Sequence, residues 1–192
     1  MGNREDLIAG AQQCLRERGW GRTTVRDIVA AAGGVSMAAI GYHFGSREAL
    51  LNAALMQSME EWGAELGRAL GAGGGGPGGS YEALWLHLIE SVRTRRPLWA
   101  GSIEAVVQAE HAPELMQHLG AGYDEGRRGM AAWLLDVAEE AVDESAVRGI
   151  GAVQMALISG VMIQWLLDPQ RAPTASDVVA GVRALAATLG PA

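Results

Sequence analysis

The sequence predicts an all-α fold. Hydrophobic residues recur at helical spacing, as in Leu7, Ala11 and Leu15, and no segment alternates apolar and polar residues as a half-buried strand would. Glycine and proline stand where these patterns end. With 192 residues the chain is long enough to bury a core, and we expect roughly nine helices in two unequal parts.

The chain opens with two predicted helices. The first runs from about residue 4 to residue 18 and stops at Gly19, which favours the left-handed backbone that often ends a helix. Thr24 followed by Asp27 is a variant of the capping box, in which each residue accepts a hydrogen bond from the other's backbone amide. This pair predicts a second, short helix over 25–32.

A glycine pair at 33–34 breaks the second helix, and Ser36 is placed to cap a third helix that ends near Phe44. Two short helices joined by a turn with glycine are typical of a helix-turn-helix. Gly45 and Ser46 end this unit, and the apolar pattern after them predicts one long helix over 47–70.

Residues 71–80 contain seven glycines and little apolar surface, so we expect a flexible surface loop there. Beyond it every segment has helical period, and prolines at 97, 113, 169 and 173 divide the pattern. Thr174 with Asp177 caps the last helix. The predicted helices are 81–95, 97–110, 113–139, 144–167 and 175–189.

Charge is distributed unevenly along the chain. The formal net charge is −7, which argues against a protein that coats nucleic acid in general. Residues 1–47 nevertheless carry six arginines and four acidic residues, a formal charge of +2, and the remaining 145 carry −9. Only the N-terminal part is therefore electrostatically suited to meet phosphate.

The third helix has the features of a helix that reads a DNA groove. Three residues, Val35, Ile40 and Phe44, are expected to face the core. The outward candidates for base contact are Ser36, Met37, Ala38 and Tyr42. Because Met37 and Ala38 cannot donate a bidentate hydrogen bond to guanine, we expect base readout through thymine methyl groups and DNA shape.

Phosphate contacts are expected from basic and hydroxyl side chains around this helix, which would fix register rather than sequence. The candidates are Arg22, Thr24, Arg26, Tyr42, His43 and Arg47. For each arginine the alternative is a solvated surface charge, and for His43 it is a ring packed against the helix end.

Three runs within this region resemble the N-terminal motif of TetR-family regulators: residues 24–28, 34–36 and 42–50. The resemblance covers about 47 residues; beyond them only helix number and length match. Two departures stand out, since the turn at 33–34 is one residue longer than usual and Gly41 stands where the family most often has tyrosine. Tyr42 could take over the phosphate contact of that missing hydroxyl.

The resemblance implies a helix-turn-helix DNA-binding domain over 1–47 and a ligand-binding and dimerisation domain over 48–192. It implies a ligand-responsive transcriptional regulator, most often a repressor, that binds palindromic operator DNA as a homodimer and is released by a small apolar or amphipathic molecule. An activator, or a regulator that ignores small molecules, is an open alternative. A helical carrier of hydrophobic ligands without DNA binding is another.

The two last helices are the expected dimer element. Residues 149–167 are uncharged and reach the length of a membrane span, but Gln154, Ser159 and Gln164 interrupt them, so burial in a helix bundle is the preferred interpretation and no membrane partner is expected. Together with the amphipathic helix 175–189, this segment resembles the two-helix element through which TetR-like subunits form a four-helix dimer core.

The C-terminal part is rich in tryptophan and methionine, which suit apolar ligands, although plain core packing is the alternative for any one residue. Polar groups on the same helices could orient a ligand: His87, Arg95, Glu104, Gln108, Tyr123, Arg127 and Gln164. The ligand-binding candidates are Trp85, Leu88, Trp99, Ile103, Met116, Tyr123, Arg127, Met130, Trp133, Met155 and Met162.

Catalysis is not expected, because the histidines lack an HExxH arrangement and no serine stands in a nucleophile-elbow context. No cofactor and no metal are predicted; Glu114 and His118, four residues apart, are best explained as a solvated face. The single cysteine, Cys14, and the absence of a signal-peptide pattern indicate a cytoplasmic protein.

Overall fold

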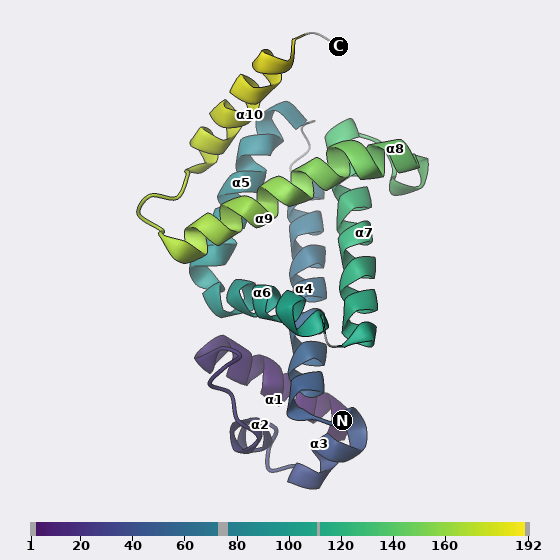
Figure 1. The fold of residues 1–192 in the computed structure, drawn as a ribbon, viewed down its shortest axis with the longest axis vertical. Helices are drawn as coiled ribbons and strands as arrows, with labels where there is room; N and C mark the ends of the chain where they lie inside the picture. Colours follow the sequence, from purple (N-terminus) through teal and green to yellow (C-terminus); the bar gives the residue numbers. More distant parts are fainter. Residues whose placement is uncertain (1–2, 73–76, 111, 191–192) are drawn as a thin grey trace. The chain divides into compact units, whose positions relative to one another are not determined.

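The computed structural model describes residues 3–72, 77–110 and 112–190 (Figure 1). Within these ranges every regular element is helical, which confirms the all-α prediction. The chain forms two compact units. The first unit holds the residues up to 66 together with 95–116, and the second holds 67–94 together with the residues from 117 onward.

The helices follow the sequence pattern closely. In chain order they are α1 (Asn3–Arg18), α2 (Val25–Ala31), α3 (Met37–Phe44), α4 (Arg47–Ala72), α5 (Pro77–Thr94), α6 (Arg96–Ala109), α7 (Pro113–Leu135), the 3₁₀ turn η1 (Glu139–Ala141), α8 (Glu144–Ala146), the π-helical turn η2 (Val147–Gly151), α9 (Ala152–Leu167) and α10 (Ala175–Leu189). The elements α8, η2 and α9 form one continuous helix, Glu144–Leu167.

In the first unit, α1 packs against α2, α3 and α6. The apolar face predicted for α1 is buried, with Leu7 and Ala11 fully inaccessible. Ile28 of α2, Ile40 of α3 and Leu50 of α4 are also buried, so each short helix contributes one large side chain to a shared core. This burial, rather than intrinsic helix propensity, stabilises helices as short as α2 and α3.

The turn between α2 and α3 explains the glycine pair. Ala32 is the C-cap of α2, the Gly33 amide donates to the Ala30 carbonyl at 3.3 Å, and the Gly34 amide donates to the Val29 carbonyl at 2.9 Å. These two hydrogen bonds form a Schellman motif. Gly33 and Gly34 have φ of 77° and 85°, a left-handed conformation in which a Cβ is strained. Each glycine is therefore required by the turn.

In the second unit, α5 packs against both α9 and α10. The side chains of Leu84, Trp85 and Leu88 on α5 are fully buried, and Met162 of α9 and Val178 of α10 are nearly so. The predicted capping box of the last helix is present, because Thr174 and Asp177 each accept a hydrogen bond from the other's backbone amide.

The predicted loop over 71–80 is wrong at both ends. Residues 71 and 72 belong to α4, and α5 begins at Pro77 rather than at residue 81. Proline suits the first turn of a helix, because its φ is already helical and its missing N–H would have no partner within the helix. The predicted flexibility of 73–76 falls outside the described residues.

Helix α7 ends at Leu135, four residues before the predicted end at 139. Asp136 adopts φ of 55°. Its amide donates to the Trp133 carbonyl at 3.4 Å, and the Val137 amide donates to the Ala132 carbonyl at 3.1 Å. This is again a Schellman arrangement, but with aspartate in the left-handed position where glycine is usual. Because no glycine stands at this position, no helix stop signal is visible in the sequence there.

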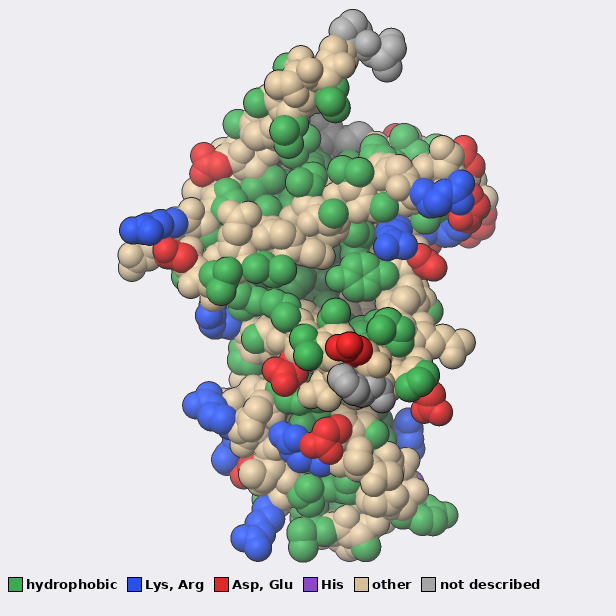
Figure 2. Space-filling model, viewed as in Figure 1, with side chains coloured by type: hydrophobic (Ala, Val, Ile, Leu, Met, Phe, Trp, Pro, Cys, Tyr) green, Lys and Arg blue, Asp and Glu red, His purple; other side chains and the backbone are tan. Residues whose placement is uncertain are grey.

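The continuous helix Glu144–Leu167 is long and apolar enough to cross a membrane by length and composition alone. Only 28% of its most apolar window is buried within the protein. Figure 2 shows hydrophobic side chains on the surface over α9 and α10. A mostly uncovered apolar helix needs a partner, since large exposed apolar patches mark interaction sites.

Candidate nucleic-acid interface and sensor cluster

The predicted outward face of α3 is exposed. Met37 is 58% exposed and Tyr42 is 85% exposed, whereas Ile40 is buried and Val35 and Phe44 are half-buried. The outward side chains of the predicted reading surface are those of Ser36, Met37, Ala38 and Tyr42. Large apolar and aromatic side chains held in solvent on a short helix are unusual for a purely structural element.

The N-termini of α2 and α3 are capped differently. At α2 the Thr24 hydroxyl accepts the Asp27 amide at 3.3 Å, and the Asp27 carboxylate accepts the Thr24 amide at 2.9 Å, so the predicted capping box is confirmed. At α3 Ser36 occupies the N-cap position but its side chain makes no capping hydrogen bond. The exposed Ser36 hydroxyl is therefore not committed to the α3 N-terminus.

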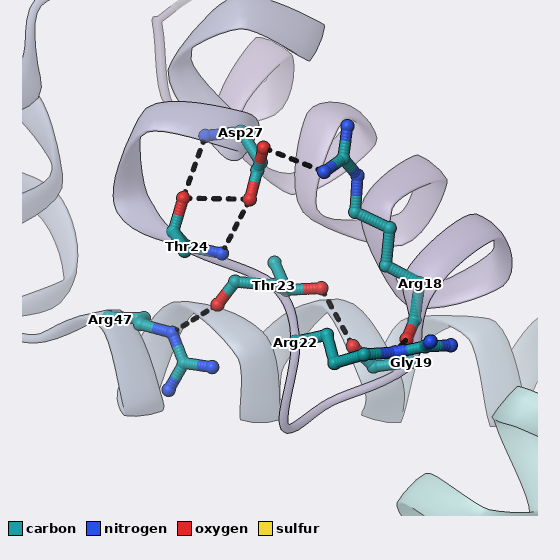
Figure 3. A network of polar contacts seen from close by, with 7 residues as sticks. All are labelled: Arg18, Gly19, Arg22, Thr23, Thr24, Asp27 and Arg47. Carbon is teal, nitrogen blue, oxygen red and sulfur yellow. Dashed lines mark hydrogen bonds and ion pairs between the residues drawn. The ribbon is translucent and has the colours of Figure 1, made fainter.

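The first turn of α2 is tied to α1 by charge (Figure 3). Arg18 forms an ion pair with Asp27, with 3.0 Å between guanidinium nitrogen and carboxylate oxygen. Hydrogen bonds from the side chain and backbone of Thr24, with a smaller contribution from Arg18, hold the pKa of Asp27 below its ordinary value. Asp27 also places a negative charge beside the first-turn amides of α2, where it interacts favourably with the helix dipole.

Arg47 joins the start of α4 to the turn between α1 and α2. Its Nε donates to the Thr23 carbonyl at 2.6 Å (Figure 3). One terminal nitrogen donates to the Trp20 carbonyl at 2.8 Å. The other terminal nitrogen donates to Glu48 at 2.8 Å. The Arg47 side chain is 22% exposed. All three guanidinium nitrogens are thus engaged inside the protein, and the predicted phosphate contact of Arg47 stays untested.

The other predicted phosphate contacts lie on the surface. Arg22 and Arg26 are exposed, and the Nε of Arg22 donates to the Arg18 carbonyl at 3.0 Å. His43 is half-buried and its ring packs edge-on against Tyr42, with centroids 4.9 Å apart. Contact of any of these side chains with DNA stays a prediction.

The placement of α2 depends on a glycine in α1. A Cβ at Gly10 would lie 2.8 Å from the Ala32 amide nitrogen and 2.9 Å from the Ile28 carbonyl oxygen, closer than real Cβ atoms approach other backbone. Helices α1 and α2 therefore cross backbone to backbone. This close crossing positions the turn and α3 relative to α1.

Comparison with known families decides the identity of this unit. Residues 7–54 match the family model of the bacterial regulatory proteins of the tetR family. The matched segment contains the buried residues of α1 to α3, the glycine turn and all nine predicted DNA-binding residues. Residues 7–54 thus form a DNA-binding domain of the tetR family.

Solved structures show that the fold of this chain as a whole is similar to that of several transcriptional regulators. A regulator from Pseudomonas aeruginosa PAO1 is 22% identical, with a TM-score of 0.69, and the match covers 97% of this chain and 89% of that one. A regulator from Saccharomonospora viridis, solved with choline, is 18% identical, with a TM-score of 0.64 and coverage of 94% and 93%.

NalD from Pseudomonas aeruginosa, described as the secondary repressor of a multidrug efflux pump, is 21% identical, with a TM-score of 0.53 and coverage of 88% and 86%. Comparison with curated protein sequences gives no match. The tetR family consists of DNA-binding regulators rather than enzymes, so the match over residues 7–54 favours a regulator over an enzyme and over a carrier without DNA binding.

In the second unit of this regulator, three helices meet around Tyr81 of α5. Its hydroxyl donates to Gln154 Oε1 of α9 at 2.8 Å. Its ring stacks on Trp133 of α7, with centroids 6.5 Å apart and planes 19° apart, and meets Trp85 edge-on at 6.3 Å. The predicted residues Trp85 and Trp133 are thus brought together by a tyrosine that the sequence analysis did not select.

Other predicted ligand residues of this unit lie in its interior or at its edge. Leu88 and Met162 are buried, and the Met155 thioether lies against Gly126 of α7. Met130 is half-buried, whereas Tyr123 is 38% exposed. These positions are compatible with an interior site that includes Met155, and they give no support for a contact by Tyr123.

The remaining candidates belong to the first unit. Trp99 is buried and packs edge-on against Trp62, with centroids 4.9 Å apart, while Ile103 and Met116 are exposed. Arg95, predicted as a polar group that could orient a ligand, instead donates from Nη2 to both carboxylate oxygens of Glu65, at 2.7 and 3.0 Å. The surroundings of these residues offer no support for a ligand role.

Gln154 is not among the ligand-binding residues predicted from the sequence, where it counts only as an interruption of the apolar segment 149–167. In the structure it is 3% exposed, and its Nε2 has no hydrogen-bond partner among the described residues. Trp85 Nε1 and Arg127 Nε are likewise buried without a partner within the described chain. A polar residue in an otherwise apolar helix was the available signal.

Proposed function

We propose that this regulator represses transcription by binding palindromic operator DNA as a homodimer, and that a small molecule bound in the second unit releases it. The observation that supports this most directly is the exposed face of α3, where Met37 and Tyr42 stand in solvent on a helix whose other face is anchored by Ile40. A recognition helix enters the major groove in this way.

The contacts with DNA divide into two kinds. Met37 and Ala38 face the base edges, where their apolar surface suits thymine methyl groups. Arg22, Arg26 and Tyr42 meet the phosphates, since they are exposed near the same surface. Ser36 adds a hydroxyl that is not used to cap α3. Specificity then arises from shape and methyl contacts rather than from guanine recognition.

Dimerisation uses the uncovered face of α9 and α10. On the continuous helix a set of exposed apolar and small residues recurs at intervals of three and four: Ile150, Val153, Ala156, Gly160, Ile163 and Leu167. Such spacing places them on one stripe, and the small residues at its centre allow close approach of a second helix. Leu185 and Leu189, both exposed, extend the apolar surface along α10.

A second copy explains this stripe better than a membrane does. Glu144 and Arg148 begin the helix, only one segment of the described chain has the length and composition of a span, and α9 already packs against α5 on its other side. A subunit with one covered and one bare apolar face fits a symmetric dimer. A DNA-bound homodimer works in the cytoplasm, where the regulated DNA lies.

Effector sensing is proposed for the cluster around Tyr81, where aromatic rings and buried polar groups meet. Neighbouring structures are compatible with such roles, since one is named a repressor and another was solved with choline. Helix α4 contributes residues to both compact units and starts at the Arg47 contacts with the α1–α2 turn. A ligand that binds one arrangement better by about 1 to 3 kcal/mol is sufficient to couple the two sites.

DNA selection tests the operator proposal. Duplexes retained from a random pool by the purified protein should share a palindrome whose half-sites are about 10 base pairs, or a multiple of that, apart. Met37→Ala should alter the preferred half-site, whereas the control Leu86→Ala, on exposed α5 surface, should not. Failure to enrich any palindrome would contradict the proposal.

Oligomeric state tests the dimer proposal. Val153 is 60% exposed on the stripe, and Leu86 is equally exposed on α5. Sedimentation equilibrium should show a dimer for the parent protein and for Leu86→Glu, and a monomer for Val153→Glu. If Val153→Glu remains dimeric, the proposed interface is wrong. Association with lipid vesicles by the parent protein would instead favour the membrane interpretation.

A further inference from the structure

The cluster around Tyr81 has an unusual hydrogen-bonding imbalance. Its buried polar atoms without a partner among the described residues are Trp85 Nε1 and Gln154 Nε2, and Arg127 Nε of α7 adds a third in the same unit. All three are N–H donors. Within the described part of this unit, no buried side-chain acceptor lacks a donor. Buried donors without acceptors are rare and unfavourable, so their presence needs an explanation.

The two donors next to Tyr81 are held in place. Trp85 is 0% exposed, and its ring is fixed edge-on by Tyr81 one helical turn earlier on α5. Gln154 is anchored because its Oε1 accepts the Tyr81 hydroxyl at 2.8 Å, which leaves the amide NH₂ as the group without a partner. A single tyrosine thus orients an indole N–H and an amide N–H from two different helices. Preorganised donors of this kind are typical of specific ligand sites.

Three aromatic rings surround Tyr81's hydroxyl contact with Gln154, counting that of Tyr81 itself. Tyr81 and Trp133 lie nearly parallel, 19° apart, and Trp85 stands at 81° to Tyr81. Flat aromatic molecules pack against such rings through offset stacking and edge contacts. Rings alone would equally suit a quaternary ammonium ion, which aromatic cages bind through cation–π attraction.

The donors decide between these two ligand classes. A cation would face the positive ends of the indole and amide N–H groups and leave both unpaired, whereas a carbonyl or carboxylate oxygen would satisfy them. We infer that the effector is a planar aromatic molecule bearing a carbonyl or carboxylate group, whose oxygen accepts hydrogen bonds from Trp85 and Gln154. This inference rests on the proposed function, because it takes the cluster as the effector site.

Matched probes test the inference on the full-length protein. Titration calorimetry with 1-naphthoate, 1-acetonaphthone and 1-naphthylmethylamine compares an anion, a neutral ketone and a cation on one aromatic body. We expect at least one of the two oxygen-bearing probes to bind about tenfold or more tightly than the amine, the effect of roughly one additional hydrogen bond. Tighter binding of the amine, or no binding of either oxygen-bearing probe at millimolar concentration, overturns the inference.

Variants test whether the Trp85 and Gln154 N–H groups cause the preference for oxygen-bearing probes. Trp85→Phe keeps an aromatic ring but removes the indole N–H, and should weaken the better oxygen-bearing probe about tenfold while leaving the amine unaffected. Gln154→Glu keeps an oxygen for the Tyr81 hydroxyl and removes the amide donor, with the same expected direction. Trp165→Phe is the control, because the Trp165 Nε1 already donates to the Pro173 carbonyl at 2.9 Å.

Failure of this inference is distinguishable from failure of the proposed function. If Trp85→Phe binds the oxygen-bearing probes as tightly as the parent protein, the indole N–H is satisfied by water rather than by ligand, and the inference is wrong. Operator binding and its release by an effector are measured separately with duplex DNA. If the probes bind as expected but leave operator affinity unchanged, the ligand chemistry stands and the sensing proposal for this cluster fails.

Discussion

Replacement of Arg47 by glutamine separates two roles that basic residues near a recognition helix can have. One role is to neutralise a DNA phosphate, and the other is to position the helices that do so. In the structure the Arg47 guanidinium donates to the Thr23 and Trp20 carbonyls at 2.6 and 2.8 Å, so we expect the positioning role. Arg26, exposed on α2, is the matched arginine for the phosphate role.

The magnitude follows from the two carbonyl contacts of Arg47. A hydrogen bond from a charged donor contributes about 1.5 to 3 kcal/mol, and removal of the donor leaves its acceptor without a partner. Because the Arg47 side chain is 22% exposed, solvent screens part of this contribution. We therefore expect Arg47→Gln to lower the free energy of unfolding by about 2 to 3 kcal/mol, while Arg26→Gln changes it by less than about 0.5 kcal/mol.

The salt dependence of operator binding completes the assay. Loss of one phosphate contact reduces the slope of log K against log salt by about 0.9, whereas loss of a positioning contact weakens binding without a change in slope. We expect the reduced slope for Arg26→Gln and the parent slope for Arg47→Gln, measured by fluorescence anisotropy with the selected operator. If Arg47→Gln keeps the parent stability and loses about 0.9 from the slope, it is a phosphate contact and our reasoning is wrong.

Three further predictions concern the scaffold of the DNA-binding unit. Gly10→Ala should lower the free energy of unfolding by about 1 to 3 kcal/mol, because the added Cβ would meet the α2 backbone. The control Gly63→Ala, whose Cβ would have open space on α4, should raise the free energy of unfolding by about 0.5 to 1 kcal/mol. Equal effects of the two substitutions in urea titrations would refute the close crossing. Gly33→Ala should lower it by about 1 to 2 kcal/mol because of its φ of 77°, and thermal melts that show no loss would refute the strained turn. Because the pKa of Asp27 is lowered in the folded state, its carboxylate contributes to the free energy of unfolding. This contribution is fully present at a pH above 3.8, the ordinary pKa of the group, and is lost as the pH falls through the folded-state pKa. Asp27→Asn should therefore flatten the acid limb of stability against pH, and an unchanged limb would contradict this.

The sequence by itself determined the elements that local chemistry controls. The periodic apolar residues placed α1, α4 and α10 within two residues of their ends, and the Thr24 and Thr174 capping boxes fixed the starts of two helices. These features depend on residues within one or two turns of each other, so they are visible in a linear pattern. The exposed face of α3 could be predicted for the same reason, since Ile40 sets which side is buried.

The sequence prediction failed where a helix begins or ends without the residues that usually mark its boundary. Helix α7 stops at Asp136 in the left-handed conformation, which aspartate adopts far less often than glycine. Helix α5 begins at Pro77 within a glycine-rich segment whose composition favours a loop. In both places packing or backbone geometry overrides composition.

Only the tertiary structure decided which side chains act together. Arg47 lies 24 residues from the Thr23 carbonyl that it binds, and Tyr81 lies 73 residues from Gln154, so no local pattern connects either pair. Whether an arginine faces phosphate or a backbone carbonyl, and whether a buried glutamine fills space or offers a free amide, depends on groups supplied by other helices. Those groups converge only when the helices pack, because packing rather than sequence distance brings donors to acceptors.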